Sequence, residues 1–360
     1  MFDLHDELYE FYKSHVRLSK EQRDELIGFR DTNIERLEAG LDNLDYPHPV
    51  RIRGQGSIAM ETANQHPNKD YDMDTALIFN KRDLPSSALD ARKRVEAAMI
   101  SGGGNFKRPP EARTNAVTVW YQEGHHVDLA VHRRYFDAYG NEIIEHAGAT
   151  WTPRDPVKIA NWFDDLVDQV SPSKDNGAAV QSEQLRRIVQ LVKKFSRSRS
   201  SWTLPGGLII TTLVAERYVC DYDRDDVALY QTMLSIYNRL QLWTDVYNPV
   251  DPAQKLTYKD KYVNQVKQLR DKLGDALEWL KPLFSASCTR ADAIKAWNKV
   301  FNHEYWDGLE VEEARSLGKS LQRAAQLGSL FVTPSGKVET SRPNEGGLNI
   351  PAHRFYGEDE

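Results

Sequence analysis

Two aspartates, Asp72 and Asp74, lie one residue apart within YDMDTALIF, a run whose apolar residues are typical of a β-strand. Because side chains alternate between the two faces of a strand, both carboxylates point to the same face. Two ionised aspartates on one face repel each other and need a cation or hydrogen-bond donors close by. The chain must therefore fold so that one face of this strand borders a charged or polar site.

A third aspartate, Asp128, lies in HHVDLAV, where the flanking apolar residues predict a second strand of the same sheet. Three carboxylates that converge from neighbouring strands offer the oxygen ligands preferred by Mg²⁺ or Mn²⁺, and they do not suit zinc. Such a site can hold two ions roughly 3.5–4 Å apart, one activating an attacking hydroxyl and one neutralising leaving phosphates. Asp72, Asp74 and Asp128 are therefore the candidate catalytic residues and metal ligands.

A Gly-Ser pair, Gly56 and Ser57, precedes the Asp-x-Asp strand. Glycine lets the backbone approach a phosphate closely, while the serine hydroxyl and nearby N–H groups donate to its oxygens. Each motif alone is common by chance, and an isolated Asp-x-Asp usually lies on a solvated strand edge or in a turn. The ordered set of helix, Gly-Ser, Asp-x-Asp strand and later aspartate in an apolar strand predicts a nucleotidyltransferase site.

Composition excludes several classes of protein. The chain has 360 residues and a net charge of −6, which disfavours a generic nucleic-acid coat. No apolar run approaches the roughly 20 residues that span a bilayer, and the first residues lack the apolar region of a signal peptide. Two cysteines cannot build a disulfide framework. We therefore expect a cytoplasmic protein that is not inserted in a membrane.

The hydrophobic pattern predicts an α+β fold in three parts. Residues 1–152 form the catalytic core with a mixed sheet and a long helix, which begins at the Ser19/Gln22 capping box and continues to about Leu44. Residues 153–332 form an α-helical lobe, and residues 333–360 an irregular tail. The further predicted strands are 116–122, 125–133 and 141–148, and the further predicted helices are 86–99, 156–170, 182–195, 204–219, 226–240 and 263–280.

The stretch GQGSIAMETANQHPNKDYDMDTALIF, followed by HHVDLAV, resembles the core signature of the polymerase-β-like nucleotidyltransferases. More narrowly it is similar to the bacterial CD-NTases, relatives of cyclic GMP–AMP synthase and oligoadenylate synthase that work in anti-phage signalling. WTPRDPVKIANWF resembles the segment by which these enzymes enter their helical lobe. The resemblance implies a bilobal protein, with a polymerase-β-like core, an α-helical lobe and the active site between them.

The resemblance also implies a reaction. A ribose hydroxyl attacks the α-phosphate of a bound ribonucleoside triphosphate, ATP among the substrates, and pyrophosphate leaves. Repetition with ring closure yields a cyclic di- or trinucleotide, and two Mg²⁺ or Mn²⁺ ions are the expected cofactors. The alternatives are another transferase of this superfamily, which adenylylates or tails RNA, a protein or a small molecule, and a catalytically silent nucleotide sensor.

The segment QLRRIVQLVKKFSRSRSSW matches the place where the family usually has a lysine that reaches the triphosphate, followed by a serine or threonine. Lys193 or Lys194, with Ser200 or Ser201, are the matching positions. The alternative is a solvated basic face, because helix C-termini favour lysine and arginine in any case. The candidate nucleotide-binding residues are Gln55, Gly56, Ser57, Lys193, Lys194 and Ser201.

Two departures from better-known relatives limit the expected partners. No cysteine cluster matches the zinc insertion by which animal cyclic GMP–AMP synthases sense DNA, so we expect no DNA requirement. DYDRDD, at 221–226, lacks the glycine and distal glutamate of a calcium loop and predicts a helix–helix connection with an N-capping aspartate. The tail 333–360 predicts docking of a regulatory protein, and an unbound solvated tail is the alternative.

Overall fold

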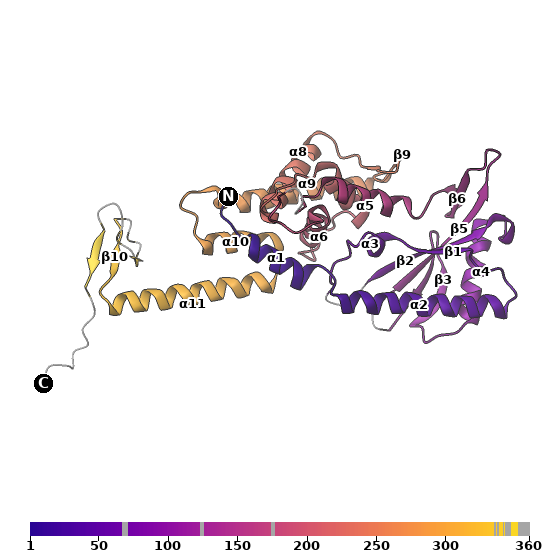
Figure 1. Ribbon diagram of the computed structural model, residues 1–360, viewed down its shortest axis with the longest axis horizontal. Coiled ribbons are helices and arrows are strands. Elements are labelled where there is room, and N and C mark those ends of the chain that lie inside the picture. The colour runs from indigo at the N-terminus through magenta and orange to yellow at the C-terminus, as the bar shows by residue number, and fades with distance from the viewer. Residues whose placement is uncertain are drawn as a thin grey trace. The chain divides into compact units, whose positions relative to one another are not determined.

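The computed structural model describes residues 1–66, 71–122, 126–173, 177–334, 336, 338–340, 342 and 347–351, except for the side chain of Asp72. The chain divides into two compact units (Figure 1). One is His5–Leu277, and the other joins Met1–Leu4 to Glu278–Glu360. The first unit contains every candidate site residue. The boundaries predicted near residues 152 and 332 stay a prediction.

A seven-stranded mixed sheet forms the centre of the first half of this unit, which confirms the predicted α+β class. Strands β2 and β5 run parallel, and the other pairs are antiparallel. Their order is β1 (Arg51–Gly54), β2 (Asp72–Asn80), β5 (His126–Phe136), β4 (Val117–Trp120) and β3 (Arg108–Ala112), while β6 (Glu142–Ala147) pairs with β5 and with β7 (Trp151–Pro153).

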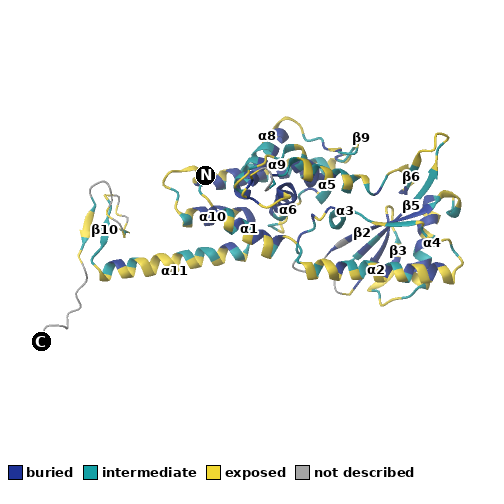
Figure 2. Ribbon diagram, viewed as in Figure 1, coloured by how far each residue is buried: buried dark blue, intermediate teal, exposed yellow. Residues whose placement is uncertain are grey.

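Two helices cover one face of this sheet. Helix α2 (Lys20–Asn43) begins at the predicted capping box, with Ser19 as its N-cap, and α4 is Ala88–Ser101. They share one apolar core with alternate residues of the central strands, Met73, Leu77 and Phe79 of β2 and Val127, Leu129 and Val131 of β5. The central strands are accordingly coloured as buried in Figure 2. The same alternation puts Asp74 and Asp128 on the face away from these helices.

Helices build the second half of the unit, as the sequence predicts. Helix α6 is central to it, because every residue of the helix except Lys194 is buried. Its Arg187 makes a buried ion pair with Asp225 of α8, in which Nε lies 2.8 Å from Oδ2. The elements are α5 (Lys158–Val170), α6 (Gln184–Ser196), α7 (Gly207–Arg217), α8 (Asp225–Leu242), the hairpin β8 (Tyr247–Asn248) and β9 (Asp251–Lys255), and α9 (Asp260–Leu280).

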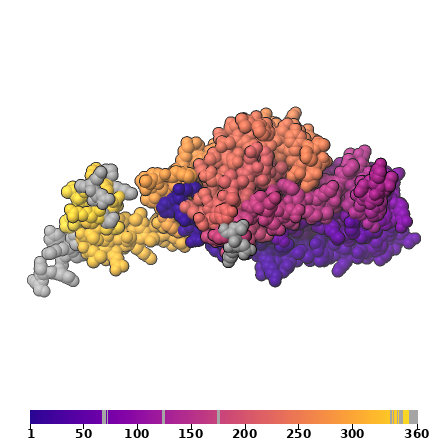
Figure 3. Space-filling model, turned by 45° about the horizontal axis from the view of Figure 1, so that its top comes forward, coloured from indigo at the N-terminus to yellow at the C-terminus, as the bar shows by residue number. Residues whose placement is uncertain are grey.

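The N-terminal segment packs onto this helical half. Helix α1 (His5–Phe11) contacts α8, and the π-helical turn η1 (Tyr12–Val16) that follows it contacts α6. Figure 3 shows the segment in indigo against these helices. The contacts join residues more than 170 positions apart in the sequence, as in the hydrogen bond from Tyr12 to Gln190.

The second unit has its own apolar core around the stacked rings of Trp297, Phe301 and Trp306. The unit contains η4 (Lys281–Phe284), α10 (Arg290–Phe301) and α11 (Glu304–Gln326), followed by β10 (Leu330–Val332), β11 (Val338–Glu339) and β12 (Leu348–Ile350). The last three strands form a small antiparallel sheet. Two of these strands, β11 and β12, lie within the segment 333–360 that the sequence predicted to be irregular. The sequence did not indicate them because strands of two or three residues are too short to show an alternating pattern.

Several features differ from the sequence-based expectation. Strand β3, which was not predicted, contains Pro109 and Pro110. These prolines are tolerated because the strand lies at the sheet edge and its register shifts at this point. The 221–226 segment does connect two helices, but the predicted aspartate cap was wrong, since Arg224 is the N-cap of α8 and makes no side-chain cap. Residues 123–124, which separate the predicted strands 116–122 and 125–133, lie outside the described residues. Within the described part of the chain, none of the helices combines the length and the apolar character of a membrane span.

Candidate active site

A cavity of about 320 Å³ lies in the first unit, bordered by the Gly-Ser turn, β2, the 154–160 segment, α6 and the start of α7. Charged and polar groups from both halves of the unit line it. The residues that matter for the chemistry below are Gln55, Gly56, Ser57, Asp74, Lys193 and Arg197.

The Gly-Ser turn closes directly onto the second aspartate of the pair. Gly56 begins the short helix α3 (Gly56–Ala59) with φ of +64°, a conformation that favours glycine. A Cβ atom at this position would lie 2.1 Å from Oδ2 of Asp74. The N–H of Gln55 donates to the backbone carbonyl of Asp74 at 2.8 Å. The sequence therefore needs glycine at position 56 for the turn to approach the carboxylate.

The aspartates lie on neighbouring strands as the sequence predicts. Asp74 of β2 pairs in register with Asp128 of the parallel strand β5, and both side chains are partly buried. The Thr118 hydroxyl donates to Oδ1 of Asp128 at 2.5 Å. The backbone of Asp72 continues the same strand face, although its side chain is not described.

This donor set fits a hard divalent cation. Carboxylate oxygens from adjacent strands are the ligands that Mg²⁺ and Mn²⁺ prefer. Among the described side chains no cluster of three potential metal ligands occurs. The side chain of Asp72, the third predicted ligand, does not belong to the described part of the chain. Asp74 and Asp128 are therefore the two ligand positions whose side chains can be located.

Lys193 lines the same cavity from helix α6. Its Nζ donates to Oγ1 of Thr62 at 2.8 Å and to the Thr62 carbonyl at 3.3 Å. Burial, with a smaller contribution from the positive charge of Arg197, lowers the pKa of Lys193 to about 7. The ammonium group is thus poorly solvated, and an anion in the cavity would favour its charged form.

The other two residues predicted from the basic run lie elsewhere. Lys194 donates from Nζ to the carbonyl of His15 at 3.0 Å and does not line the cavity. Ser201 is exposed and, like Ser200, is not among the described residues around the cavity. The structure thus brings Gln55, Gly56, Ser57 and Lys193 together with Asp74 and leaves Lys194 and Ser201 outside.

Arg197, Thr62 and Gly207 are among the cavity residues that were not assigned from the sequence. Arg197 belongs to the same basic run as Lys193, so the sequence could have indicated it as a further phosphate contact. Thr62 lies five residues beyond the Gly-Ser pair and carries no motif of its own. Gly207 is the first residue of α7, whose unpaired N–H groups suit an anion, but a Gly-Gly pair by itself does not predict a cavity.

A family model and several solved structures match this chain. Residues 50–132 match the model of the cyclic GMP-AMP synthase DncV-like nucleotidyltransferase domain. The Escherichia coli MS115-1 CdnC with ATP is 17% identical, with a TM-score of 0.60 over 84% of this chain and 98% of that one. The same CdnC has also been solved in a complex with HORMA-deltaN, at 18% identity, a TM-score of 0.61 and coverage of 82% and 96%.

Two other solved structures share the fold. The Bradyrhizobium diazoefficiens CD-NTase CdnG with GTP is 16% identical, with a TM-score of 0.62 over 86% of this chain and 98% of that one. The Vibrio cholerae DncV cyclic AMP-GMP synthase is 14% identical, with a TM-score of 0.59 and coverage of 84% and 96%.

At these identities the structural likeness establishes the fold, and the matched domain establishes the kind of catalytic core. The resemblance drawn from the Gly-Ser and Asp-x-Asp motifs is confirmed. Residues 50–132 match a DncV-like nucleotidyltransferase domain, and the chain has the α+β fold of the bacterial CD-NTases.

Proposed function

We propose that this nucleotidyltransferase joins ribonucleoside triphosphates into a cyclic di- or trinucleotide and releases pyrophosphate. The observation that carries the proposal is one constellation of side chains. Asp74 and Asp128 stand in register on adjoining parallel strands, and the Gly-Ser turn closes onto Asp74. Lys193 lines the same cavity as Asp74. Carboxylates, hydrogen-bond donors for phosphate and a buried lysine that lie near one another suit transfer between phosphate-bearing substrates.

The acids and the donors have separate roles in this proposal. Asp72, Asp74 and Asp128 would hold two Mg²⁺ or Mn²⁺ ions, which when bound activate the attacking ribose hydroxyl and neutralise the phosphates. The Ser57 hydroxyl and the N–H groups of the turn, next to Gln55 and Gly56, orient the triphosphate. Lys193 supplies a positive charge to its phosphates. Lys194 and Ser201 keep no direct role in this assignment, because neither lines the cavity.

The relatives that share the fold favour nucleotide substrates and a regulated enzyme. Their structures include a complex with ATP, one with GTP, a cyclic AMP-GMP synthase and a complex with HORMA-deltaN. We infer that ATP is among the substrates, that a regulatory protein controls the activity, and that the product signals in anti-phage defence. The reducing cytoplasm is the expected compartment, where the free thiols of Cys220 and Cys288 would remain reduced.

Product analysis tests the proposal. The purified protein is incubated with all four ribonucleoside triphosphates and Mg²⁺ or Mn²⁺, treated with phosphatase, and analysed by mass spectrometry. A phosphatase-resistant cyclic product supports the proposal, while a nucleotide joined to RNA, protein or a small molecule supports the alternative transferase. The Asp72→Asn, Asp74→Asn double variant should be inactive yet folded, because it removes two mutually repelling charges. Turnover in that variant at matched metal would contradict the assignment of the acids.

A further inference from the structure

Three polar side chains on one face of α6 hold the segment that forms a wall of the cavity. Arg186, Gln190 and Lys193 are spaced i, i+4 and i+7, so they lie along one side of the helix. They donate hydrogen bonds to three carbonyl groups of the segment 60–63, which follows the Gly-Ser turn. The pairs are Arg186 with Met60, Gln190 with Ala63 and Lys193 with Thr62.

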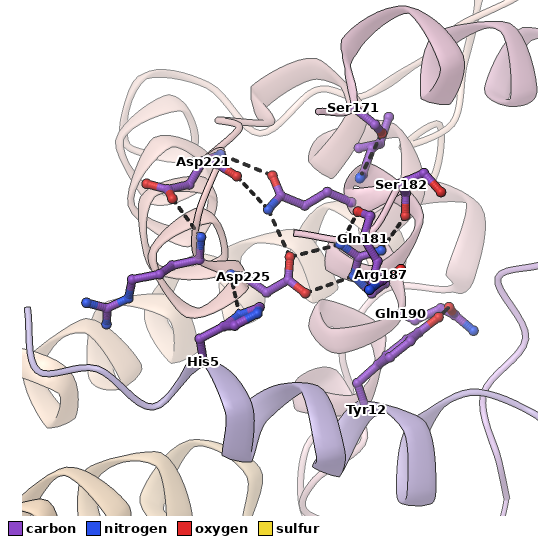
Figure 4. Close-up of polar contacts among 12 residues, drawn as sticks. His5, Tyr12, Ser171, Gln181, Ser182, Arg187, Gln190, Asp221 and Asp225 are labelled. Carbon is purple, nitrogen blue, oxygen red and sulfur yellow. Dashed lines mark hydrogen bonds and ion pairs between the residues drawn. The ribbon is translucent and has the colours of Figure 1, made fainter. Parts of the chain in front are cut away.

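Gln190 is the most completely bonded member of this row. Its Nε2 donates to the Ala63 carbonyl at 2.8 Å, and its Oε1 accepts from the Tyr12 hydroxyl at 2.8 Å. Its own backbone carbonyl accepts from Nδ2 of Asn64 at 2.9 Å. The residue is only 2% exposed, so water cannot replace these partners easily. Figure 4 shows Tyr12 and Gln190 directed toward one another.

The orientation of the Gln190 carboxamide follows from its partners. A backbone carbonyl can only accept, so the NH₂ group must face Ala63. Burial raises the pKa of Tyr12 to about 12, so its hydroxyl stays protonated and donates to the opposite oxygen at neutral pH. Tyr12 of the N-terminal segment thereby donates to the end of Gln190 that faces away from the cavity wall.

The wall is tied in turn to the Gly-Ser turn. The N–H of Met60 donates to the Gly56 carbonyl at 3.2 Å, and the N–H of Thr62 donates to the Ser57 carbonyl at 2.8 Å. Ala63 and Asn64 themselves line the cavity. A displacement of the wall therefore reaches the residues that stand against Asp74.

We propose that Gln190 is a positioning residue for nucleotide transfer, an inference that rests on the proposed function. It touches neither the cavity nor the acids. By fixing Ala63 and Asn64, it holds the Gly-Ser turn at its correct distance from Asp74. Its loss should therefore lower the rate of transfer more than the affinity for nucleotide, because a misplacement of about 1 Å can reduce a rate about 100-fold.

Gln184, on the same helix, provides a matched control. It is also fully buried, and its Nε2 donates to Asp225 Oδ1 at 2.8 Å and to the Asp221 carbonyl at 2.9 Å. Its Oε1 accepts from the Tyr218 hydroxyl at 2.6 Å. None of these partners is among the described residues that line the cavity. If Gln190 had a purely structural role, Gln184→Leu and Gln190→Leu would have the same effect on kcat per folded molecule.

The test compares the two full-length variants for thermal stability, kcat and KM for ATP, and hydrogen exchange of the backbone. Both substitutions should lower Tm. Gln190→Leu should also lower kcat per folded molecule by about tenfold or more, with KM changed less than about threefold, and should speed exchange in residues 56–65. Gln184→Leu should keep kcat near the wild-type value and speed exchange around residues 218–226 instead.

Equal kcat in the two variants at matched stability would overturn the positioning role, as would a Gln190→Leu variant that changes KM alone. If Gln190→Leu does not fold, Tyr12→Phe retains the carboxamide but removes the donor to its oxygen. That variant should show a smaller loss of kcat with faster exchange in 56–65, and unchanged values for both would refute the inference. A wild-type protein that transfers no nucleotide would instead refute the proposed function.

Discussion

The substitution Gly56→Ala should separate the stability of the fold from the geometry of its site. Gly56 has φ of +64°, and a methyl group there would lie 2.1 Å from Oδ2 of Asp74 and 3.1 Å from its Cγ. The methyl carbon and Oδ2 must move apart by roughly 1.3 Å before they reach ordinary van der Waals contact. A carboxylate at the end of a short side chain can yield by that amount, but it then leaves its position in the site.

The expected magnitudes differ for folding and for activity. An alanine held at positive φ costs about 1–2 kcal/mol, which for a unit of this size lowers Tm by a few degrees. A displacement of about 1 Å at a reacting group reduces the rate about 100-fold. Gly56→Ala should therefore remain folded at room temperature and lose nearly all nucleotide transfer.

Gly140→Ala is the matched control. Gly140 also has positive φ, +81°, but it lies in the turn between β5 and β6. Apart from its two chain neighbours, no described residue has an atom within 4 Å of the added methyl group. The two variants should lose similar stability in thermal or urea unfolding. Only Gly56→Ala should lose activity, measured as labelled product per folded molecule. Wild-type activity in Gly56→Ala, or equal loss in both variants, would refute the close approach of the turn to Asp74.

Four other outcomes are expected. Ser57→Ala should weaken triphosphate binding by about 0.5–1.5 kcal/mol without lowering Tm, and a lower Tm with unchanged affinity would make Ser57 structural. Because burial lowers the pKa of Lys193 to about 7, triphosphate affinity should fall as pH rises from about 6 to about 8, and calorimetry on Lys193→Met should show this dependence lost. Burial lowers the pKa of His132 to about 3 and that of His146 to about 4. The unfolded chain binds these protons below about pH 6.5, so the free energy of unfolding should decrease as pH drops below that value, by up to about 1.4 kcal/mol per pH unit for each histidine. Urea unfolding of His132→Phe should show a shallower decrease. Truncation after Thr333 should leave basal synthesis near wild type, since the cavity residues all precede it, and a folded but inactive truncation would contradict this.

Much of the first unit could be predicted because its signals are local. The Ser19 capping box marks the start of α2, and the alternation of apolar residues in β2 and β5 marks both strands and the face that the aspartates occupy. The short strand β3 could not be predicted in the same way. Its two prolines argue against a strand unless the segment lies at a sheet edge, and edge position is a property of the assembled sheet.

The cavity depended on contacts between distant parts of the chain. The basic run at the end of α6 predicted a phosphate contact but left Lys193 and Lys194 as alternatives. Successive residues on a helix point about 100° apart, so only one of them can face a given neighbour. Both sides of α6 contact other segments, with Thr62 beside Lys193 and the carbonyl of His15 beside Lys194. The sequence of the helix contains no information on which neighbour borders the cavity.

The sequence by itself determined most of the longer elements, the shared face of Asp72 and Asp74, and the family whose motifs they resemble, because these follow from periods of two and 3.6 residues and from short motifs. Tertiary structure decided which lysine reaches the cavity, why residue 56 must be glycine beside Asp74, and how Gln190 holds a wall more than 120 residues earlier in the chain. Such contacts depend on how whole helices and strands pack against one another, and packing joins residues whose spacing along the chain carries no periodic signal.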